Sequence, residues 1–189
     1  MPFDHFDFIA GLYNRTAKFS PPAPLLKLLA LPSEGRLLDA GGGTGRVAEA
    51  LGGMVREIVV ADLSRGMLHH AAKKGLATVC AETEQLPFAA GAFDRIIMVD
   101  SLHHVRNQRQ TIKEIWRVIA RGGKIVIIEP DINKFAVKLL AFGEKMLLMR
   151  SHFLSAVTIA TLFPDQQTDV KVIHDEYNVW VYAEKVREM

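Results

Sequence analysis

The sequence predicts an α/β protein whose core is a mixed sheet of seven strands with helices on both faces. Short apolar runs bounded by turn residues alternate with helical patterns through the first two thirds of the chain, as in parallel strands joined by helices. The last two strand-like runs, 169–174 and 178–184, have only a short polar turn between them. They can pair only as an antiparallel hairpin, because a parallel crossover needs a dozen or more residues. We therefore expect five parallel strands plus a C-terminal antiparallel hairpin, which places one antiparallel strand at the edge of the sheet.

The individual elements follow from apolar runs and from capping and breaking residues. The five expected parallel strands cover residues 36–40, 57–61, 77–81, 93–99 and 124–129. The expected helices cover residues 6–19, 25–31, 46–51, 65–74, 109–120, 133–150 and 155–163. Ser64 is a favourable N-cap for the helix at 65–74, and Gly122-Gly123 is expected to end the helix at 109–120.

Length and composition limit the class of function. A chain of 189 residues with 49% hydrophobic residues can bury one sizeable core, so we expect a single domain over 1–189. The net charge of +2 argues against a nucleic-acid partner. With Cys80 as the only cysteine, neither an intramolecular disulfide nor a cysteine-based metal site is expected. The lack of a long apolar run and of a basic leader region predicts a cytoplasmic protein without a membrane span.

The most informative segment is 37–47, where an apolar run ends at Asp39 and four glycines follow within five residues. This pattern predicts a strand, a tight turn and the start of a helix. Glycine is needed where the backbone takes positive φ or approaches a ligand closely. Gly41, Gly43 and Gly45 can therefore hold a nucleotide-like cofactor, although a tight turn without a ligand has the same pattern.

Carboxylate residues stand where the other strands end. In open parallel sheets, ligands bind outside the carboxyl ends of the strands, so 39–45, Asp62, Glu82, Asp100 and 129–131 are expected to lie together. A carboxylate following the second strand can accept hydrogen bonds from both hydroxyls of a ribose.

The alternative for Asp62 is a helix-capping role, and the alternative for Glu82 is a solvated loop carboxylate. If Asp62 binds ribose, Leu63 and Met67 would present apolar surface to an adenine ring. Glu82 could accept a hydrogen bond from the adenine amine, and the backbone N–H of Thr83 could address a ring nitrogen.

Together these motifs resemble the class I S-adenosylmethionine-dependent methyltransferases, within the group that includes the ubiquinone and menaquinone biosynthesis C-methyltransferases. The matching segments are LLDAGGGTG (37–45), VVADLS (59–64), AETEQLPF (81–88), FDRIIMVDSLHHV (93–105) and RVIARGGKIVIIEP (117–130). The resemblance covers about 36–131 and implies a Rossmann-like fold, with S-adenosylmethionine as cofactor and a small-molecule methyl acceptor.

Carried over by position, the resemblance implies a role for each matching residue. The loop at 41–45 would contact the methionine part of the cofactor, and Asp39 would orient that loop and the amino group. Asp100 and Leu102 would lie near the same amino group.

The nucleoside part of the cofactor would have its own contacts. Asp62 would bind ribose, and Glu82 and Thr83 would bind adenine. Tyr13 would belong to an N-terminal helical lid at 1–32.

Two departures from the family pattern affect the site. Many relatives have aspartate where Glu82 stands, and the longer side chain should still reach. The helical insertion at 133–163, which shapes the acceptor pocket in this family, is short. The helix at 133–150 is expected to cover the site, or else to form a pliable wall for an apolar acceptor or a surface for peripheral membrane contact.

His103 and His104 follow Asp100 and are candidate catalytic residues. Either ring could act as a general base, or it could serve packing and cofactor contact. Methyl transfer from a sulfonium is an in-line displacement that depends on alignment more than on a base, and no metal is expected. The alternatives are a nicotinamide-dependent oxidoreductase and a non-catalytic S-adenosylmethionine-binding module. The sequence does not predict the oligomeric state.

Overall fold

The computed structural model describes residues 19–132, 134, 152–164 and 168–186. The expected helix at 133–150, Tyr13 and nearly all of the expected helix at 6–19 therefore lie outside the described residues. Within 1–32, the described part contains helix α2 (Ala23–Leu28). Within 133–163, it contains helix α7 (Ala156–Ala160), which is shorter than the predicted span of 155–163.

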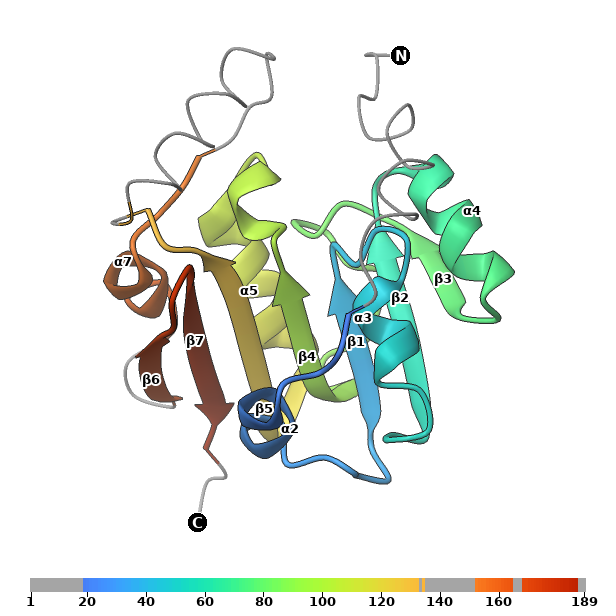
Figure 1. Ribbon diagram of the computed structural model, residues 1–189, viewed down its shortest axis with the longest axis horizontal. Helices are drawn as coiled ribbons and strands as arrows, with labels where there is room; N and C mark the ends of the chain where they lie inside the picture. Colours follow the sequence, from blue (N-terminus) through green and yellow to red (C-terminus); the bar gives the residue numbers. More distant parts are fainter. Residues whose placement is uncertain (1–18, 133, 135–151, 165–167, 187–189) are drawn as a thin grey trace.

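Seven strands form one sheet in the order β3-β2-β1-β4-β5-β7-β6 (Figure 1). Their bounds are β1 Arg36–Ala40, β2 Glu57–Asp62, β3 Ala77–Cys80, β4 Phe93–Val99, β5 Ile119–Pro130, β6 Thr168–His174 and β7 Asn178–Lys185. Strands β1 to β5 pair in parallel, while β7 pairs antiparallel with both β5 and β6. The predicted fold class is thus confirmed. The sequence predicts the antiparallel strand at the edge of the sheet, but β7 lies one place inside it. The short turn after β6 lets β6 pair on the outer side of β7, so β6 is the edge strand.

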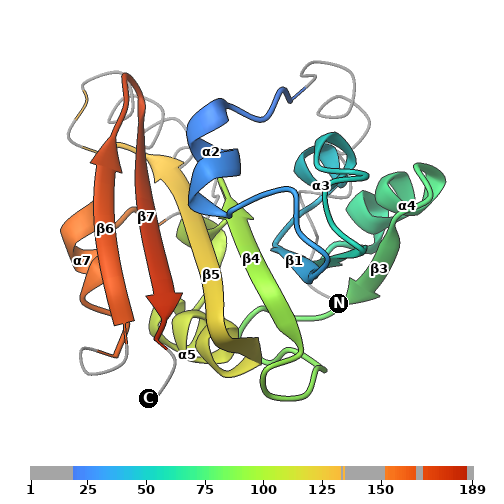
Figure 2. The same cartoon turned by 90° about the horizontal axis from the view of Figure 1, so that it is seen from below.

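Helices cover both faces of the sheet (Figure 2). On one side lie α2, α3 (Arg46–Ala50) and α4 (Arg65–Lys73), which bury Leu25, Val47 and Leu68 against the sheet. On the other side lie α5 (Gln108–Val118) and α7, which share a large apolar cluster with residues of β1, β2, β4, β5 and β7.

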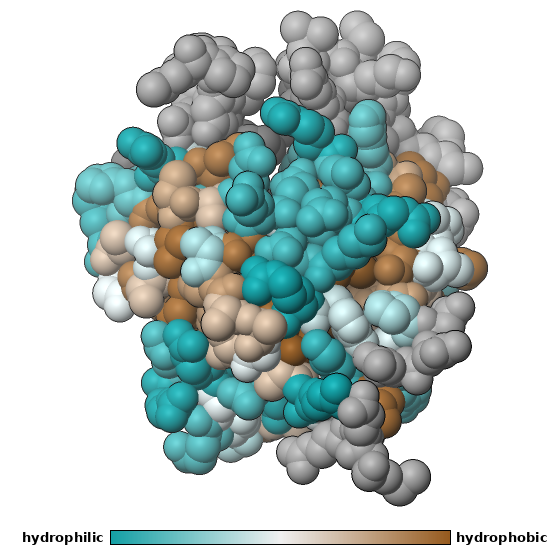
Figure 3. Space-filling view, turned by 180° about the vertical axis from the view of Figure 1, so that it is seen from behind, coloured by the Kyte–Doolittle hydropathy of each residue, from teal (hydrophilic) through white to brown (hydrophobic). Residues whose placement is uncertain are grey.

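The polar and apolar sides of α5 explain its position. Ile112, Ile115 and Val118 are buried, whereas Arg109 and Lys113 are exposed, as expected for an amphipathic surface helix. Figure 3 shows the molecule from behind the view of Figure 1, and hydrophilic residues cross the middle of this face with hydrophobic ones beside them.

The boundary between α5 and β5 differs from the sequence prediction. The helix ends at Val118, and the strand begins at Ile119 without an intervening loop. The reason is tertiary pairing: Ile119 is buried and lies opposite Phe93 in β4. The register then shifts before Arg95 pairs with Lys124. Gly122-Gly123 therefore lies within this irregular stretch of β5 and does not end the helix.

Candidate active site

The loop that follows β1 packs tightly at two of its glycines. Gly41 has φ +69° and Gly45 has φ +71°, a region that side chains with a Cβ rarely adopt. A Cβ at Gly41 would lie 2.7 Å from the Ser101 Oγ, and a Cβ at Gly45 would lie 2.4 Å from a methyl carbon of Leu76. Glycine at these two positions is thus explained by packing within the protein.

Gly43 differs from its neighbours because a Cβ there would meet ordinary van der Waals contacts and no clash. Its φ is +54°, but the nearest atoms to a Cβ would be the Met67 Sδ at 3.9 Å and an Asp62 carboxylate oxygen at 4.0 Å. The missing side chain at Gly43 therefore leaves space between a carboxylate and a thioether, on the side of the loop toward α4.

Asp62, at the end of β2, connects the glycine loop to the start of α4. One carboxylate oxygen accepts the Gly43 N–H at 2.9 Å, and the other accepts the Ser64 N–H at 2.8 Å. Ser64 in turn caps α4 by accepting the Met67 N–H at 3.2 Å, as the sequence predicts. These two backbone contacts place the Asp62 carboxylate between the glycine loop and the start of α4. Its role in ribose binding stays a prediction.

The residues predicted to flank adenine lie next to Asp62. Leu63 is 61% exposed, which is unusual for a leucine in this fold, while Met67 is buried. Glu82 is exposed and lies two residues past Cys80, which pairs with Asp62 across β2 and β3.

The neighbouring Thr83 is buried, and its hydroxyl lies 3.1 Å from the Thr111 hydroxyl of α5. The structure thus brings Asp62, Leu63, Met67 and Glu82 to one edge of the sheet, with Thr83 anchored beside them.

Asp39 is a buried carboxyl group directly beneath the glycine loop. It is 1% exposed, and within the described part of the chain its Oδ2 has no hydrogen-bond partner. A Cβ at Gly42 would lie 2.5 Å from its carboxyl carbon. Burial is the main cause that raises the pKa of Asp39 to about 7; a hydrogen bond from the Ala48 backbone and the charge of Arg46 act against it, and nearby Asp62 acts with it. A buried unsatisfied oxygen of this kind is costly unless a ligand or water satisfies it.

The raised pKa of Asp39 predicts a pH-dependent stability. Because the folded-state pKa of about 7 lies above the ordinary value of 3.8, the folded state binds more protons than the unfolded state between these limits. The free energy of unfolding of the wild type should fall by about 1.4 kcal/mol per pH unit between pH 4 and 7, relative to Asp39→Asn. Urea denaturation of both proteins across this range measures the difference, and parallel profiles would contradict it.

The segment after β4 approaches the glycine loop from the other side. Asp100 adopts φ +51° and lies 3.7 Å from the Arg46 guanidinium at the start of α3. The Ser101 hydroxyl donates to the Ala40 carbonyl oxygen at 3.3 Å. Leu102 is buried and begins the short 3-10 helix η1 (Leu102–His104). Asp100 and Ser101 therefore lie beside the loop, while the place of Asp100 and Leu102 near the methionine amino group stays a prediction.

Glu129, near the end of β5, holds this segment in place. It is 3% exposed, and one of its oxygens accepts the N–H groups of Ser101 at 3.0 Å and Leu102 at 2.8 Å. The other accepts the His103 N–H at 3.3 Å and lies 2.5 Å from the His103 Nδ1. Sequence reasoning placed Glu129 at this edge but missed its role as an anchor. The available signal was a single carboxylate closing the apolar run IVII at 125–128.

The two candidate histidines are enclosed to different degrees. His103 is 4% exposed, and its ring stacks on Phe153 with centroids 4.3 Å apart. His104 is partly buried, with its ring centroid 3.9 Å from that of His103. Burial, and secondarily the nearby His103, lowers the pKa of His104 to about 3. The His104 ring is therefore neutral at pH 7 and binds a proton weakly, while a base role for either histidine stays a prediction.

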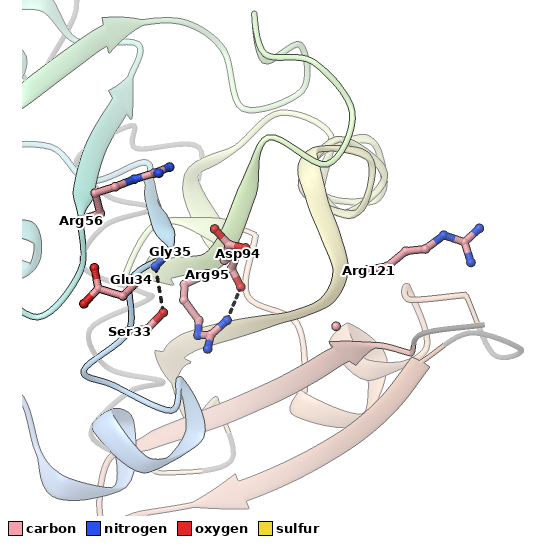
Figure 4. Close-up of a pocket in the computed structure, with 8 residues that line it drawn as sticks. Ser33, Glu34, Gly35, Arg56, Asp94, Arg95 and Arg121 are labelled. Atoms are coloured by element: carbon pink, nitrogen blue, oxygen red, sulfur yellow. Dashed lines mark hydrogen bonds between the residues drawn. The ribbon is translucent and has the colours of Figure 1, made fainter. Parts of the chain in front are cut away.

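A hollow of about 520 Å³ lies at the opposite end of the strands (Figure 4). Its lining includes Gly35 before β1, Asp94 at the start of β4 and the side chains of Arg95 and Arg121. Arg95 donates to the Leu29 and Asp94 carbonyl oxygens, and Arg121 points away from the other labelled residues. These groups do not converge on a common point, so this hollow is not the candidate site.

Neither a metal cluster nor a membrane-spanning helix occurs among the described residues. They contain no group of three or more His, Cys, Asp or Glu side chains that could hold a metal ion. They also contain no helix that is long and apolar enough to cross a membrane.

Sequence relatives share the part of the chain that builds this edge. A methyltransferase domain family matches residues 38–127. The chain is 34% identical over 105 residues to the ubiquinone/menaquinone biosynthesis C-methyltransferase of Coxiella burnetii, covering 50% of this chain and 42% of that protein. It is 35% identical over 104 residues to the demethylmenaquinone methyltransferase of Corynebacterium urealyticum, covering 53% and 45%. The matches thus span less than half the length of these relatives.

Solved structures share the whole fold. A SAM-dependent methyltransferase from Thermotoga maritima superposes with a TM-score of 0.77 at 22% identity, covering 95% of this chain and 98% of the other. A chain from a complex with the Haloferax volcanii Trm112 methyltransferase activator gives 0.80 at 15% identity, covering 99% and 100%. At such identities the likeness concerns the fold alone. It is the family match, with the relatives at 34–35% identity, that identifies residues 38–127 as a class I S-adenosylmethionine-dependent methyltransferase domain.

Proposed function

We propose that this protein transfers a methyl group from S-adenosylmethionine to a small, apolar acceptor. The observation that carries the proposal is the space beside Gly43, where a Cβ would fit without a clash next to Asp62 and Met67. The unsatisfied carboxyl oxygen of Asp39 lies beneath the same loop. A glycine-lined space beside a partly buried carboxylate and a buried orphan oxygen fits a ligand that brings its own hydrogen-bond donors.

The residues at this edge match the parts of the proposed cofactor. Asp62 would accept the ribose hydroxyls, and exposed Leu63 would be covered by adenine, with Glu82 and Thr83 beside it. Asp39 and Asp100 would face the methionine amino group, where negative charge favours an ammonium. The cofactor, when bound, supplies an electrophilic methyl group on a sulfonium.

The protein's own contribution to the chemistry would be alignment. Holding donor and acceptor in near-attack geometry can supply a large part of the rate enhancement in such a displacement. The Glu129 contacts and the Phe153 stack fix the His103 side of the site, and the neutral His104 ring adds no charge next to a sulfonium.

Two observations bear on the class of acceptor. The relatives named above act in ubiquinone and menaquinone biosynthesis by their names, and the stacked rings of His103 and Phe153 would give the acceptor side an aromatic wall. Both favour a small apolar acceptor.

Peripheral membrane contact would follow if such an acceptor resides in a bilayer, and co-sedimentation with liposomes at low salt tests it.

Turnover tests the proposal directly. We expect purified protein to transfer the tritium-labelled methyl group of S-adenosylmethionine to at least one member of a panel of small phenols, quinols and amines. Binding of S-adenosylhomocysteine without transfer to any member would favour the non-catalytic module. Binding of NADH, measured by fluorescence, together with no binding of S-adenosylhomocysteine would favour the oxidoreductase.

Gly43→Ala tests whether a ligand occupies this space, because the new side chain would not clash with the protein itself. The new methyl group would meet no protein atom closer than 3.9 Å, so the stability cost should be that of the left-handed backbone, about 1 to 2 kcal/mol. The methyl would occupy cofactor space, and we expect the affinity for S-adenosylhomocysteine to fall by about tenfold or more.

Gly75→Ala is the matched control for Gly43→Ala. Gly75 has φ +78° and no atom within 4 Å of a Cβ, and it lies past the end of α4. This variant should lose similar stability in urea denaturation and keep full affinity in a calorimetric titration. Equal affinities of the two variants would contradict a cofactor at Gly43.

A further inference from the structure

We propose that Glu129 is a positioning residue, which fixes the ring and the proton position of His103 and holds the 101–103 turn against the glycine loop. The inference rests on the proposed function and deepens it. It assigns to a strand residue the task of joining the donor side of the site, at Gly41, to the acceptor side, at His103.

The carboxylate of Glu129 is saturated by the turn. Its two oxygens receive four donors, which are the backbone N–H groups of residues 101, 102 and 103 and the Nδ1 of His103. An ionised carboxylate offers about four acceptor sites, so none remains for a substrate. Glu129 is also 3% exposed. Its influence on the reaction must therefore pass through the residues that it holds.

The short contact with the ring determines the His103 tautomer. An ionised carboxylate can only accept hydrogen bonds, so at 2.5 Å from Glu129 the Nδ1 must carry the hydrogen. In the neutral ring, Nε2 is then the nitrogen without a hydrogen. Phe153 also fixes the ring by stacking on it at an interplanar angle of 14°. The backbone of His103 is held by the His152 N–H, which donates to the His103 carbonyl oxygen at 2.7 Å.

The same turn is packed against the donor side. The Ser101 hydroxyl donates to the Ala40 carbonyl oxygen, and the space of a Cβ at Gly41 is occupied by the Ser101 side chain. Asp100, just before the turn, is held in a left-handed conformation by its N–H bond to the Ile128 carbonyl oxygen at 2.9 Å. A shift of the 101–103 turn would therefore displace both Asp100 and the start of the glycine loop.

Glu129→Gln tests the proton position at nearly constant shape. The amide keeps one acceptor oxygen, which the N–H groups of Ser101 and Leu102 would retain, and places an NH₂ donor toward the His103 ring. The ring nitrogen facing that donor must then accept, so the hydrogen moves to Nε2.

Nitrogen-15 NMR of ¹⁵N-histidine-labelled full-length protein, assigned with His103→Asn, reads the tautomer directly. At pH 8 we expect a protonated-type Nδ1 shift in the wild type and an unprotonated-type Nδ1 shift in Glu129→Gln. An unprotonated Nδ1 in the wild type would overturn the proposal without any variant. An unchanged Nδ1 in Glu129→Gln would overturn it too, because a residue that served only the backbone of the turn would leave the tautomer as it was.

A calorimetric titration with S-adenosylhomocysteine tests the link to the donor side. We expect Glu129→Gln to bind about tenfold more weakly, since at least one charge-assisted hydrogen bond to the turn is lost. The matched control is Glu184→Gln, at the far end of the sheet, where a carboxylate likewise accepts from Lys124 at 2.6 Å and from Tyr182. It should keep both the His103 tautomer and the wild-type affinity.

Equal affinities of the wild type and Glu129→Gln would overturn the link between the two sides. If the wild type itself binds no S-adenosylhomocysteine, the proposed function fails, and the nitrogen shifts still decide the tautomer on their own.

Discussion

Replacing Asp62 with alanine is expected to lower the affinity for S-adenosylhomocysteine by more than about a hundredfold, or about 3 kcal/mol, which corresponds to two lost charge-assisted hydrogen bonds. The physical reason is twofold. The proposed ribose contacts disappear, and the Gly43 N–H loses the acceptor that holds the loop at 2.9 Å. The thermal stabilisation that the ligand gives to the wild type should therefore vanish at ligand concentrations up to millimolar.

Two variants separate binding from local structure in this experiment. Asp62→Asn keeps one acceptor oxygen and the shape of the side chain, so we expect an intermediate loss of affinity. Ser64→Ala removes the cap of α4 at a cost of about 1 kcal/mol but leaves Asp62 in place, so its affinity should match the wild type. A melting temperature that rises equally with ligand in Asp62→Ala and the wild type would exclude a ribose role.

Gly45→Ala is expected to destabilise the fold by about 2 to 5 kcal/mol. The left-handed backbone at φ +71° costs an alanine about 1 to 2 kcal/mol, and overpacking costs about 1 to 3 kcal/mol more. The new methyl would lie 2.4 Å from Leu76 and 3.0 Å from the Ala71 Cβ of α4. Urea denaturation gives the free energy of unfolding for both proteins.

Gly75→Ala again provides the control, because it shares the left-handed backbone and lacks the contacts. The difference between the two variants isolates the close packing of the glycine loop on α4. Equal losses of stability would mean that the loop can move away from Leu76 and Ala71, and the loop could not then be a rigid part of the site.

Most of the sheet is predictable from local signals. Strands such as Phe93–Val99 and Arg36–Ala40 have the bounds that their apolar runs predict, and Ser64 caps α4 as its residue type suggests. The boundary at Ile119 is not predictable locally, because it depends on pairing with Phe93 across the sheet. The position of β7 inside the edge is not predictable locally either, because the local pattern does not say which strand of the hairpin pairs with β5.

The candidate site divides in the same way. Spacing after each strand places Asp39, Asp62, Glu82 and Asp100 at one edge, because the carboxyl ends of parallel strands meet there. The partners of these groups are not in the local pattern. Only the structure shows that Asp62 binds the loop and the start of α4 at once, and that Asp39 keeps an unsatisfied oxygen. The contact between Glu129 and His103 joins residues 26 positions apart, which no motif spacing announces.

The central claim is that the glycine-loop edge binds the cofactor through Asp62. Isothermal titration of the wild type and Asp62→Ala with S-adenosylhomocysteine tests it most directly. The structure predicts saturable binding with one site per chain in the wild type and no measurable heat in the variant. Absence of binding in the wild type at millimolar ligand, or equal binding by both proteins, would contradict it.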